Sequence, residues 1–394
     1  MLKVVFIADV GLAGGATKSL IEVVTTLKNN HNIVPVVLTS QNSEMNAKLT
    51  ELGIENHVTG HCPFMQGEPD AKWKKPVKWI LFAMKYCLSY KSSFNKALAQ
   101  VDWDSVDLIH TNVARLDIGM RIAKEKGIPS ITHIREFAEL DFNCWSYRPH
   151  YVSYLADNND GFIAISNAVR DYWVQKGIPK DKITVIYNGV DYTKIACADH
   201  GTWESDKALK LVIAGGVIPN KGQWQAIDAI CGLPDDIVNN IRLDVMGGIT
   251  ETYQAKLSEP LKKRGILDQV SFLGACSDVY DRLKDYHIGL MCSKAEGFGR
   301  VTVEYMHAGL GVIASDTGAN PELINDGENG LLYKRSDTAT LTDAIRRLYE
   351  DRKLLISIAD NGKASAAEKF RNDINAKNIY EYYLKMTKKG NGHE

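Results

Sequence analysis

The chain has 394 residues, of which 45% are hydrophobic and 24% charged, and its formal net charge is −1. This balance excludes a protein held to nucleic acid by overall positive charge, and we predict no nucleic-acid partner. The seven cysteines include no Cys-x-x-Cys pair, which argues against a disulfide framework and a zinc knuckle. We therefore expect a reducing, cytoplasmic location, with no signal peptide and no membrane-spanning segment.

Short β-branched runs alternate with helical stretches along almost the whole chain. This pattern predicts doubly wound α/β domains, whose parallel sheets are covered on both faces. The first series of predicted strands is residues 3–8, 33–39, 107–112, 130–136, 161–166 and 183–190. The second series is residues 209–216, 241–248, 270–275, 288–293, 311–315 and 330–333, after a polar stretch at 191–208. We predict an N-terminal domain over 1–192, a C-terminal domain over 193–370, and a helix and tail over 371–394.

The first predicted strand runs into the glycine-rich sequence GLAGGATKS at residues 11–19. A P-loop would need glycine at positions 12 and 17, where the chain has Leu12 and Thr17. This mismatch excludes an ATP-cleaving loop. The role of the loop therefore depends on evidence from the rest of the chain.

Residues 71–96 contain seven lysines, six aromatic residues and no acidic residue. Trp79, Phe82, Tyr86 and Tyr90 are spaced to share one face of a helix. Lysines beside such aromatic residues are typical of a helix on an anionic membrane, so we predict a peripheral contact at the inner face of the plasma membrane. Alternatively, the aromatic stripe packs into the core and the lysines are solvated.

The sequence SKAEGFGRVTVE at residues 293–304 predicts a glycine-flanked turn after a strand, with a helix from about Arg300. Backbone N–H groups at a helix N-terminus bind phosphate oxygens. Glu296 and Glu304 can face the same pocket, where carboxylates accept hydrogen bonds from sugar or ribose hydroxyls. Alternatively, Glu296 caps the helix and Glu304 is solvated.

The segment EGFGRVTVE and the sequence that follows it, YMHAGLGVIASDTGANPELINDGENGLL, closely resemble the C-terminal signature of family 4 retaining glycosyltransferases. Other segments resemble motifs of that family in the same order: GGATKSL, VIYNGVD, AGGVIPNKG and VSFLGACSD. The resemblance implies GT-B architecture, in which two Rossmann-like domains face a central cleft. It also implies transfer of a hexosyl unit, with retention of configuration, from a nucleotide-diphospho-sugar, for which we expect a UDP-sugar. The expected acceptor is a glycan or a lipid-linked molecule in the assembly of cell-surface polysaccharide or glycoconjugates.

The resemblance also assigns roles to residues. It implies three catalytic residues: His133 at the donor sugar, Lys221 at the leaving diphosphate, and Glu296 at the donor sugar. For His133, the alternative is a buried structural histidine. The implied donor-binding residues are Gly14, Gly15, Ala275, Cys276, Glu296, Gly297, Phe298, Gly299, Arg300, Val301, Thr302 and Glu304.

Within that set, Glu304 is expected to hold the ribose hydroxyls, and the backbone near Ala275 and Cys276 to contact the base. The amides of residues 297–302 would bind the diphosphate and sugar hydroxyls. The loop at Gly14 and Gly15 would bring its backbone close to the donor diphosphate or the acceptor.

One departure from the family pattern concerns the phosphate clamp. The family commonly has arginine where this chain has Gly216. Arg300 lies where the family more often has an apolar residue. We hypothesise that Arg300 supplies the missing charge; the alternative is that it points to solvent.

We expect no cofactor and no metal requirement, because no Asp-x-Asp pair follows a predicted strand. Two other functions remain open. One is a GT-B-type nucleotide-sugar epimerase or hydrolase, which would turn over the donor alone. The other is a noncatalytic nucleotide-sugar-binding subunit, which the loss of the clamp arginine at Gly216 would suit.

Overall fold

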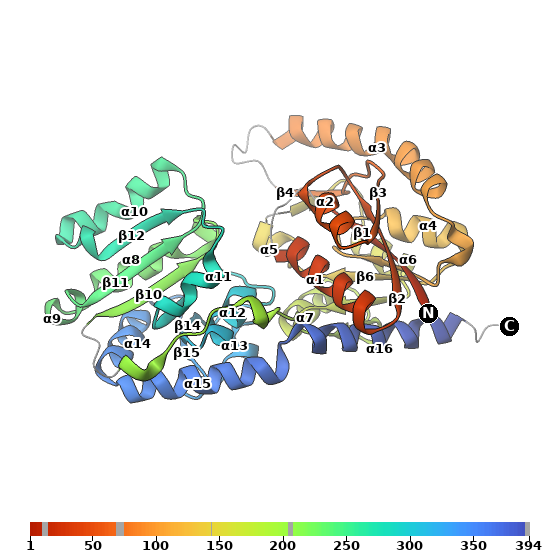
Figure 1. Ribbon diagram of the computed structural model, residues 1–394. Helices are drawn as coiled ribbons and strands as arrows, with labels where there is room; N and C mark the ends of the chain where they lie inside the picture. Colours follow the sequence, from red (N-terminus) through yellow and green to blue (C-terminus); the bar gives the residue numbers. More distant parts are fainter. Residues whose placement is uncertain (10–14, 68–74, 143, 204–207, 391–394) are drawn as a thin grey trace. The chain divides into compact units, whose positions relative to one another are not determined.

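The computed structural model describes residues 1–9, 15–67, 75–142, 144–203 and 208–390. The chain divides into two compact units (Figure 1): unit 1 is Met1–Gly189 with Asn372–Glu394, and unit 2 is Val190–Arg371. The described part of the polar stretch at 191–208 belongs to unit 2, where the Ala198 N–H donates to the Ala308 carbonyl oxygen (2.8 Å). Trp203, in the same stretch, is 3% exposed and belongs to the core of unit 2. Burial of this indole explains why the stretch packs against the unit.

Unit 1 contains a seven-stranded parallel sheet in the order β3-β2-β1-β5-β6-β8-β9. Its strands are β1 (Leu2–Ala8), β2 (Ile33–Thr39), β3 (Glu55–Val58), β5 (Leu108–Thr111), β6 (Ser130–Ile134), β8 (Gly161–Ala164) and β9 (Ile183–Val185). Its helices are α1 (Gly15–Asn30), α2 (Glu44–Glu51), α3 (Lys75–Gln100), α4 (Ile118–Lys126), α5 (Glu139–Phe142), α6 (Tyr151–Asn158), α7 (Asn167–Lys176) and α16 (Asn372–Gly390). A separate antiparallel pair joins β4 (Met65–Gly67) to β7 (Cys144–Ser146).

The central strand β1 shows why this sheet is buried on both faces. Because successive side chains of a strand point to opposite faces, Val4 and Phe6 join one apolar cluster while Val5 and Ile7 join another. Residues of α1 and α16 complete the first cluster, and residues of α4 and the end of α3 complete the second. Every residue of β1 from Val4 to Ile7 is fully buried.

The final helix α16 is part of unit 1, although unit 2 separates it from the rest of that unit in the sequence. It packs against α1 (Figure 1). Ile379 and Tyr383 are fully buried in the cluster they share with α1. The Tyr383 hydroxyl also bonds to Nδ1 of His110 on β5.

Unit 2 repeats the doubly wound plan with a six-stranded parallel sheet in the order β12-β11-β10-β13-β14-β15. Its strands are β10 (Leu209–Ala214), β11 (Ile241–Met246), β12 (Val270–Gly274), β13 (Ile288–Met291), β14 (Gly311–Ser315) and β15 (Leu331–Tyr333). Its helices are α8 (Gln223–Cys231), α9 (Asp235–Val238), α10 (Glu251–Arg264), α11 (Val279–Arg282), α12 (Arg300–Ala308), α13 (Asn320–Leu323), α14 (Thr338–Glu350) and α15 (Arg352–Lys369). The predicted α/β class is confirmed in both units.

Candidate functional site

A tightly held turn connects β13 to α12 in unit 2. The residue before the helix, Gly299, has left-handed backbone (φ +84°), which glycine adopts without strain. The Glu296 carbonyl oxygen accepts a hydrogen bond from the Ala319 N–H (2.8 Å), which ties this turn to the segment after β14. A Cβ on the neighbouring Gly318 would lie 2.3 Å from that carbonyl oxygen, so the close approach requires glycine. The turn thereby places the N-terminus of a nine-residue helix at the carboxyl edge of the sheet, where anions bind readily.

Lys221 and Glu296 come together beside this turn. Lys221 follows β10, Glu296 follows β13, and these two strands are neighbours in the sheet. Their side chains form an ion pair with 2.9 Å between Nζ and Oε2. The chain segments also approach closely: the Lys294 N–H donates to the Asn220 carbonyl oxygen (2.8 Å). Unit 2 therefore holds a cation and a carboxylate next to a helix N-terminus.

A second ion pair lies on the first turns of α12. Arg300 Nε donates to Glu304 Oε1 (2.9 Å), and the hydroxyl of Tyr280 donates to the same oxygen (2.6 Å). The side chains of Arg300 and Glu304 are only 11% and 9% exposed. Glu304 is therefore buried rather than solvated, and Arg300 points to this carboxylate rather than to solvent. Tyr280, on α11, was not predicted as part of this cluster.

His133 lies at the end of β6 in unit 1, within a buried polar network. Its Nδ1 is 3.2 Å from His110 Nε2 and 3.2 Å from Arg135 Nη2. Arg135 is held in turn by Asn112 Oδ1 (2.9 Å) and Asn188 Oδ1 (2.8 Å). Burial, reinforced by the Arg135 charge, lowers the pKa of His110 to about 3 and brings the pKa of His133 well below its usual range.

The hydrogen bond from Arg135 determines which ring nitrogen of His133 carries the proton. Because Nδ1 accepts from Arg135, the proton of the neutral ring lies on Nε2. That Nε2 is buried and has no hydrogen-bond partner in the described part of the chain. His133 is thus fully buried, and its Nε2–H donates to no partner among the described residues.

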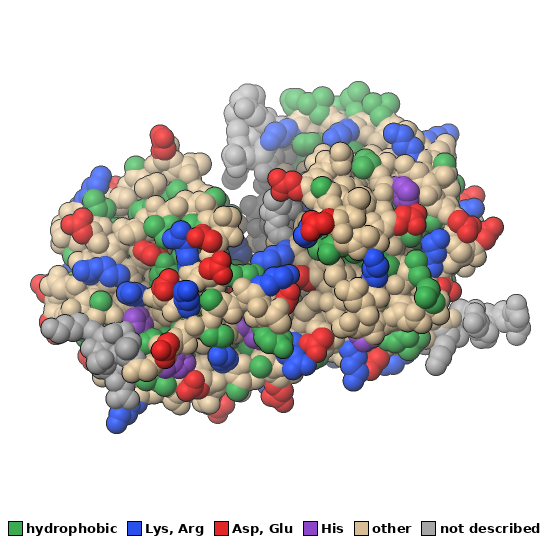
Figure 2. All heavy atoms as spheres, in the orientation of Figure 1, with side chains coloured by type: hydrophobic (Ala, Val, Ile, Leu, Met, Phe, Trp, Pro, Cys, Tyr) green, Lys and Arg blue, Asp and Glu red, His purple; other side chains and the backbone are tan. Residues whose placement is uncertain are grey.

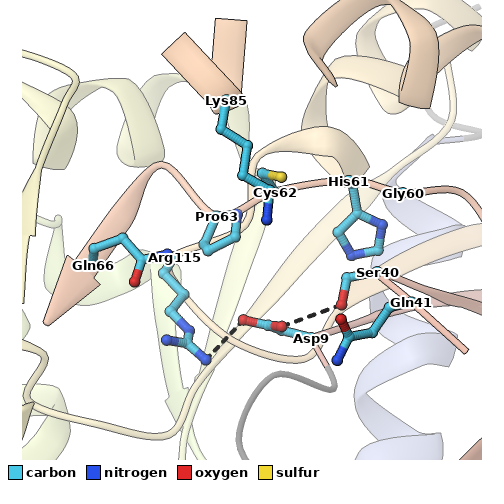
Figure 3. Close-up of a pocket in the computed structure, with 10 residues that line it drawn as sticks. All are labelled: Asp9, Ser40, Gln41, Gly60, His61, Cys62, Pro63, Gln66, Lys85 and Arg115. Atoms are coloured by element: carbon cyan, nitrogen blue, oxygen red, sulfur yellow. Dashed lines mark hydrogen bonds and ion pairs between the residues drawn. The ribbon is translucent and has the colours of Figure 1, made fainter. Parts of the chain in front are cut away.

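A pocket of about 300 Å³ lies at the carboxyl edge of the sheet in unit 1 (Figure 3). Its lining residues are Asp9, Ser40, Gln41, Gly60, His61, Cys62, Pro63, Gln66, Lys85 and Arg115. Arg115 Nη2 lies 2.7 Å from Asp9 Oδ2, and Ser40 Oγ donates to Asp9 Oδ1 (3.3 Å). This lining can bind a ligand that carries both hydroxyl groups and negative charge.

The imidazole of His61 is fixed at one side of this pocket. Its Nε2 lies 3.1 Å from the Ala8 carbonyl oxygen and its Nδ1 lies 2.7 Å from Thr59 Oγ1. The carbonyl can only accept, so Nε2 carries the proton and Nδ1 accepts from the threonine. Burial lowers the pKa of His61 to about 4, which keeps the ring neutral at pH 7.

Two family models match this chain. "Glycosyltransferase Family 4" matches residues 14–194, and "Glycosyl transferases group 1" matches residues 200–365. The chain belongs to glycosyltransferase family 4. The uncharacterized glycosyltransferase MJ1178 of Methanocaldococcus jannaschii is 27% identical over 67% of this chain and 71% of its own length. The lipopolysaccharide core biosynthesis mannosyltransferase LpsB of Rhizobium meliloti is 28% identical over 61% of this chain and 71% of its own.

Solved structures support the GT-B fold of this glycosyltransferase. Anabaena Alr3699/HepE, in complex with UDP and glucose, superposes with a TM-score of 0.76 at 21% sequence identity. The superposition covers 98% of this chain and 100% of the other. The predicted GT-B class is therefore confirmed.

The other predicted residues that belong to unit 2 lie around the same edge of its sheet. Ala275 and Cys276 directly follow β12, exposed and half-buried respectively. Phe298 is 2% exposed and packs edge-on against Phe370 (5.8 Å between ring centres), and Thr302 Oγ1 lies 3.4 Å from Asn320 Oδ1. Gly297 is buried and Val301 half-buried. In unit 1, Gly15 is the first residue of α1, and Gly14 lies outside the described residues.

The unit 1 pocket was missed in the sequence. The sequence did contain a sign of this pocket, because Asp9, Ser40 and Gly60 each follow the end of a predicted or observed strand. In open α/β sheets ligands bind beyond the carboxyl ends of strands.

Proposed function

We propose that this glycosyltransferase transfers a hexosyl unit from a UDP-sugar to a glycan or lipid-linked acceptor, with retention of configuration and without a metal ion. The observation that carries the proposal is the arrangement in unit 2: Lys221 and Glu296 form an ion pair beside the N-terminus of α12. The complex of HepE with UDP and glucose and the mannosyltransferase activity in the name of LpsB support a nucleotide-sugar donor.

In this proposal the donor diphosphate binds at the turn before α12. The helix N-terminus and the Lys221 ammonium group stabilise the negative charge that develops as the diphosphate leaves. Glu296 accepts hydrogen bonds from the sugar, and Glu304 accepts them from the ribose hydroxyls. The N–H of His133 is a further donor for the sugar.

Transfer breaks the bond between the anomeric carbon and the diphosphate oxygen and forms a bond to the acceptor hydroxyl oxygen. We propose that the acceptor attacks from the face that the diphosphate leaves, and that a diphosphate oxygen takes the hydroxyl proton. No protein carboxylate is assigned as a nucleophile in this route. The charges of the leaving group are balanced by Lys221 and the helix rather than by a divalent cation.

We assign the unit 1 pocket to the acceptor. The Asp9 carboxylate, fixed by Arg115, can accept a hydrogen bond from an acceptor hydroxyl. Replacement of Asp9 by asparagine is expected to raise the KM for the acceptor and to leave hydrolysis of the donor in its absence unchanged. Equal losses in both reactions would contradict this assignment.

The first experiment is a thermal-shift panel of uridine, guanosine and thymidine diphosphate sugars, because a ligand that binds only the folded state raises the melting temperature. Product analysis by NMR with the stabilising donor then gives the anomeric configuration, and a chelator tests the metal. We expect transfer to persist in EDTA. Full-rate turnover of donor without acceptor would indicate an epimerase or hydrolase, and binding without any turnover a noncatalytic subunit.

Variants of Lys221 and Glu296 test whether their ion pair is needed for transfer. Lys221→Ala and Glu296→Gln should each lower kcat by about 100-fold, the range for loss of one group that stabilises the transition state. Lys263→Ala is the matched control, because its ion pair with Glu259 is exposed and lies on α10. Wild-type turnover in Lys221→Ala would contradict the proposed site.

A further inference from the structure

Helix α3 of unit 1 carries a ridge of exposed apolar side chains, which we call the α3 ridge: Val77, Ile80, Leu81, Met84 and Leu88. These five side chains are between 53% and 77% exposed. Their spacing of three and four residues places them on one side of the helix. Figure 2 shows hydrophobic side chains gathered along the outer side of this helix. Single exposed apolar residues are ordinary on a protein surface, but a contiguous ridge marks an interaction site.

The opposite side of α3 is anchored to unit 1, which fixes the rotation of the helix. Trp79 stacks on Trp145 with 6.1 Å between ring centres. The Tyr86 hydroxyl bonds to Asp117, and the guanidinium of Arg121 lies 3.2 Å from the ring centre of Tyr90. Of the aromatic stripe that the sequence suggested for a membrane, Tyr86 and Tyr90 are half-buried against the protein, whereas Trp79 remains 42% exposed. The ridge on the other side cannot turn inward without breaking these contacts.

Positive charge accompanies the ridge. Residues 75–100 contain no acidic residue and five lysines. Lys78, Lys85 and Lys96 recur at offsets of seven and eighteen residues, which places them together along one flank of the ridge. Lys78, Lys85, Lys91 and Lys96 are all exposed.

An apolar ridge flanked by lysines distinguishes between two kinds of partner, a second copy of the chain and an anionic membrane. A second copy of the chain would bring two lysine-flanked ridges together and oppose like charges. An anionic bilayer accepts apolar side chains between its headgroups and attracts the flanking ammonium groups. We propose that the α3 ridge docks the protein on the surface of a membrane rich in anionic lipids. None of the helices in the described ranges is long and apolar enough to cross a bilayer, so this contact is peripheral.

Docking would also serve the acceptor pocket, a consequence that rests on the proposed function. Lys85 belongs to the flank of the ridge and also lines the unit 1 pocket (Figure 3). A protein bound through α3 would therefore hold this pocket beside the bilayer surface. An acceptor with a lipid anchor and a polar headgroup fits that position.

Flotation of the full chain with vesicles tests the proposal. We expect at least tenfold stronger binding to vesicles of phosphatidylcholine with 30% phosphatidylglycerol than to phosphatidylcholine alone. The triple variant Leu81→Gln, Met84→Gln, Leu88→Gln should lose at least tenfold of that binding. The variant Lys78→Glu, Lys91→Glu, Lys96→Glu should lose the preference for the anionic lipid. The control Leu140→Gln, Leu267→Gln changes exposed apolar residues outside the ridge and should bind as wild type.

Stabilisation by the donor, measured by thermal shift, shows that each variant is folded and separates this test from that of the proposed function. Wild-type chain that stays unbound on anionic vesicles would overturn the proposal, as would triple variants that float normally. A ridge-dependent dimer in sedimentation, without vesicle binding, would assign the ridge to a second copy and also overturn it.

Discussion

Replacement of Arg300 by methionine tests how the second cation of the candidate site in unit 2 acts. The structure ties this guanidinium to Glu304, whose carboxylate is proposed to hold the ribose. Arg300 would then position Glu304 instead of contacting phosphate, in contrast to the hypothesis that it replaces the arginine absent at Gly216. These two roles predict different dependence of nucleotide affinity on the ribose hydroxyls.

The magnitudes follow from burial. Both side chains are about one-tenth exposed. Removal of one partner of a buried ion pair lowers the free energy of unfolding by about 3–5 kcal/mol. We expect Arg300→Met to lose stability near the lower end of this range, because the Tyr280 hydroxyl still donates a hydrogen bond to Glu304. Glu304→Gln should lose about 1.5–3 kcal/mol of UDP binding, which is roughly 10- to 150-fold in Kd, because hydrogen bonds to a charged group are lost.

The assay is calorimetric titration with UDP and with 2′,3′-dideoxy-UDP, together with hydrogen exchange of α12 peptides for local stability. Wild type should bind the dideoxy nucleotide about as weakly as Glu304→Gln binds UDP. Arg300→Met should weaken UDP but leave the dideoxy nucleotide nearly unchanged, and the double variant should add little to either single one. Equal weakening of both nucleotides by Arg300→Met, or no weakening of either, would refute the positioning role.

Three further changes are predicted. Gly216→Arg should fold normally, because a Cβ there meets no atom within 4 Å, and should tighten UDP binding about fivefold by returning a cation to the clamp; unchanged or weaker affinity in titration would contradict this. Gly222→Ala and Gly265→Ala share a φ of +74°, but only the Cβ at 222 would strike a carbonyl oxygen, at 2.0 Å. The melting temperature should therefore fall clearly more for Gly222→Ala, and equal losses would show that backbone conformation alone decides. The pKa of His61 is lowered to about 4, so between pH 6.5 and 4 the unfolded chain binds a proton that the folded chain does not. The free energy of unfolding therefore decreases as the pH is lowered through that window. Between pH 7.5 and 5 this histidine should contribute about 2 kcal/mol of that loss, and urea unfolding of His61→Asn should show a correspondingly shallower pH dependence.

Much of the fold could be predicted because its strands are continuous apolar runs. Each of the predicted strands overlaps an observed strand of one of the two parallel sheets. The strands that were missed are β3, with the polar sequence ENHV, and the three-residue strands β4 and β7. Such strands carry too few apolar side chains to show periodicity, and their pairing depends on tertiary contacts.

The site could be predicted only where residues lie near one another in the sequence. The pair Arg300 and Glu304 has the four-residue spacing at which helical side chains meet, so their contact was available from the sequence. Tyr280 reaches the same carboxylate from another element, and no spacing rule connects it to α12. For α3, periodicity identified an aromatic stripe but could not say which side of the helix faces the protein.

The two ion pairs beside the start of α12 suggest how the candidate site is prepared before a donor binds. Lys221 is already neutralised by Glu296, and Arg300 by Glu304, so neither cation stands as an unbalanced charge. In the proposed function, a nucleotide-sugar offers hydroxyl groups to both carboxylates and phosphate oxygens to the Lys221 ammonium group and the helix N-terminus. Pyrophosphate alone would satisfy only the positive groups and leave the carboxylates beside added negative charge. The pairing therefore favours a complete donor over its phosphate fragment, because each carboxylate is matched by a different part of the same ligand.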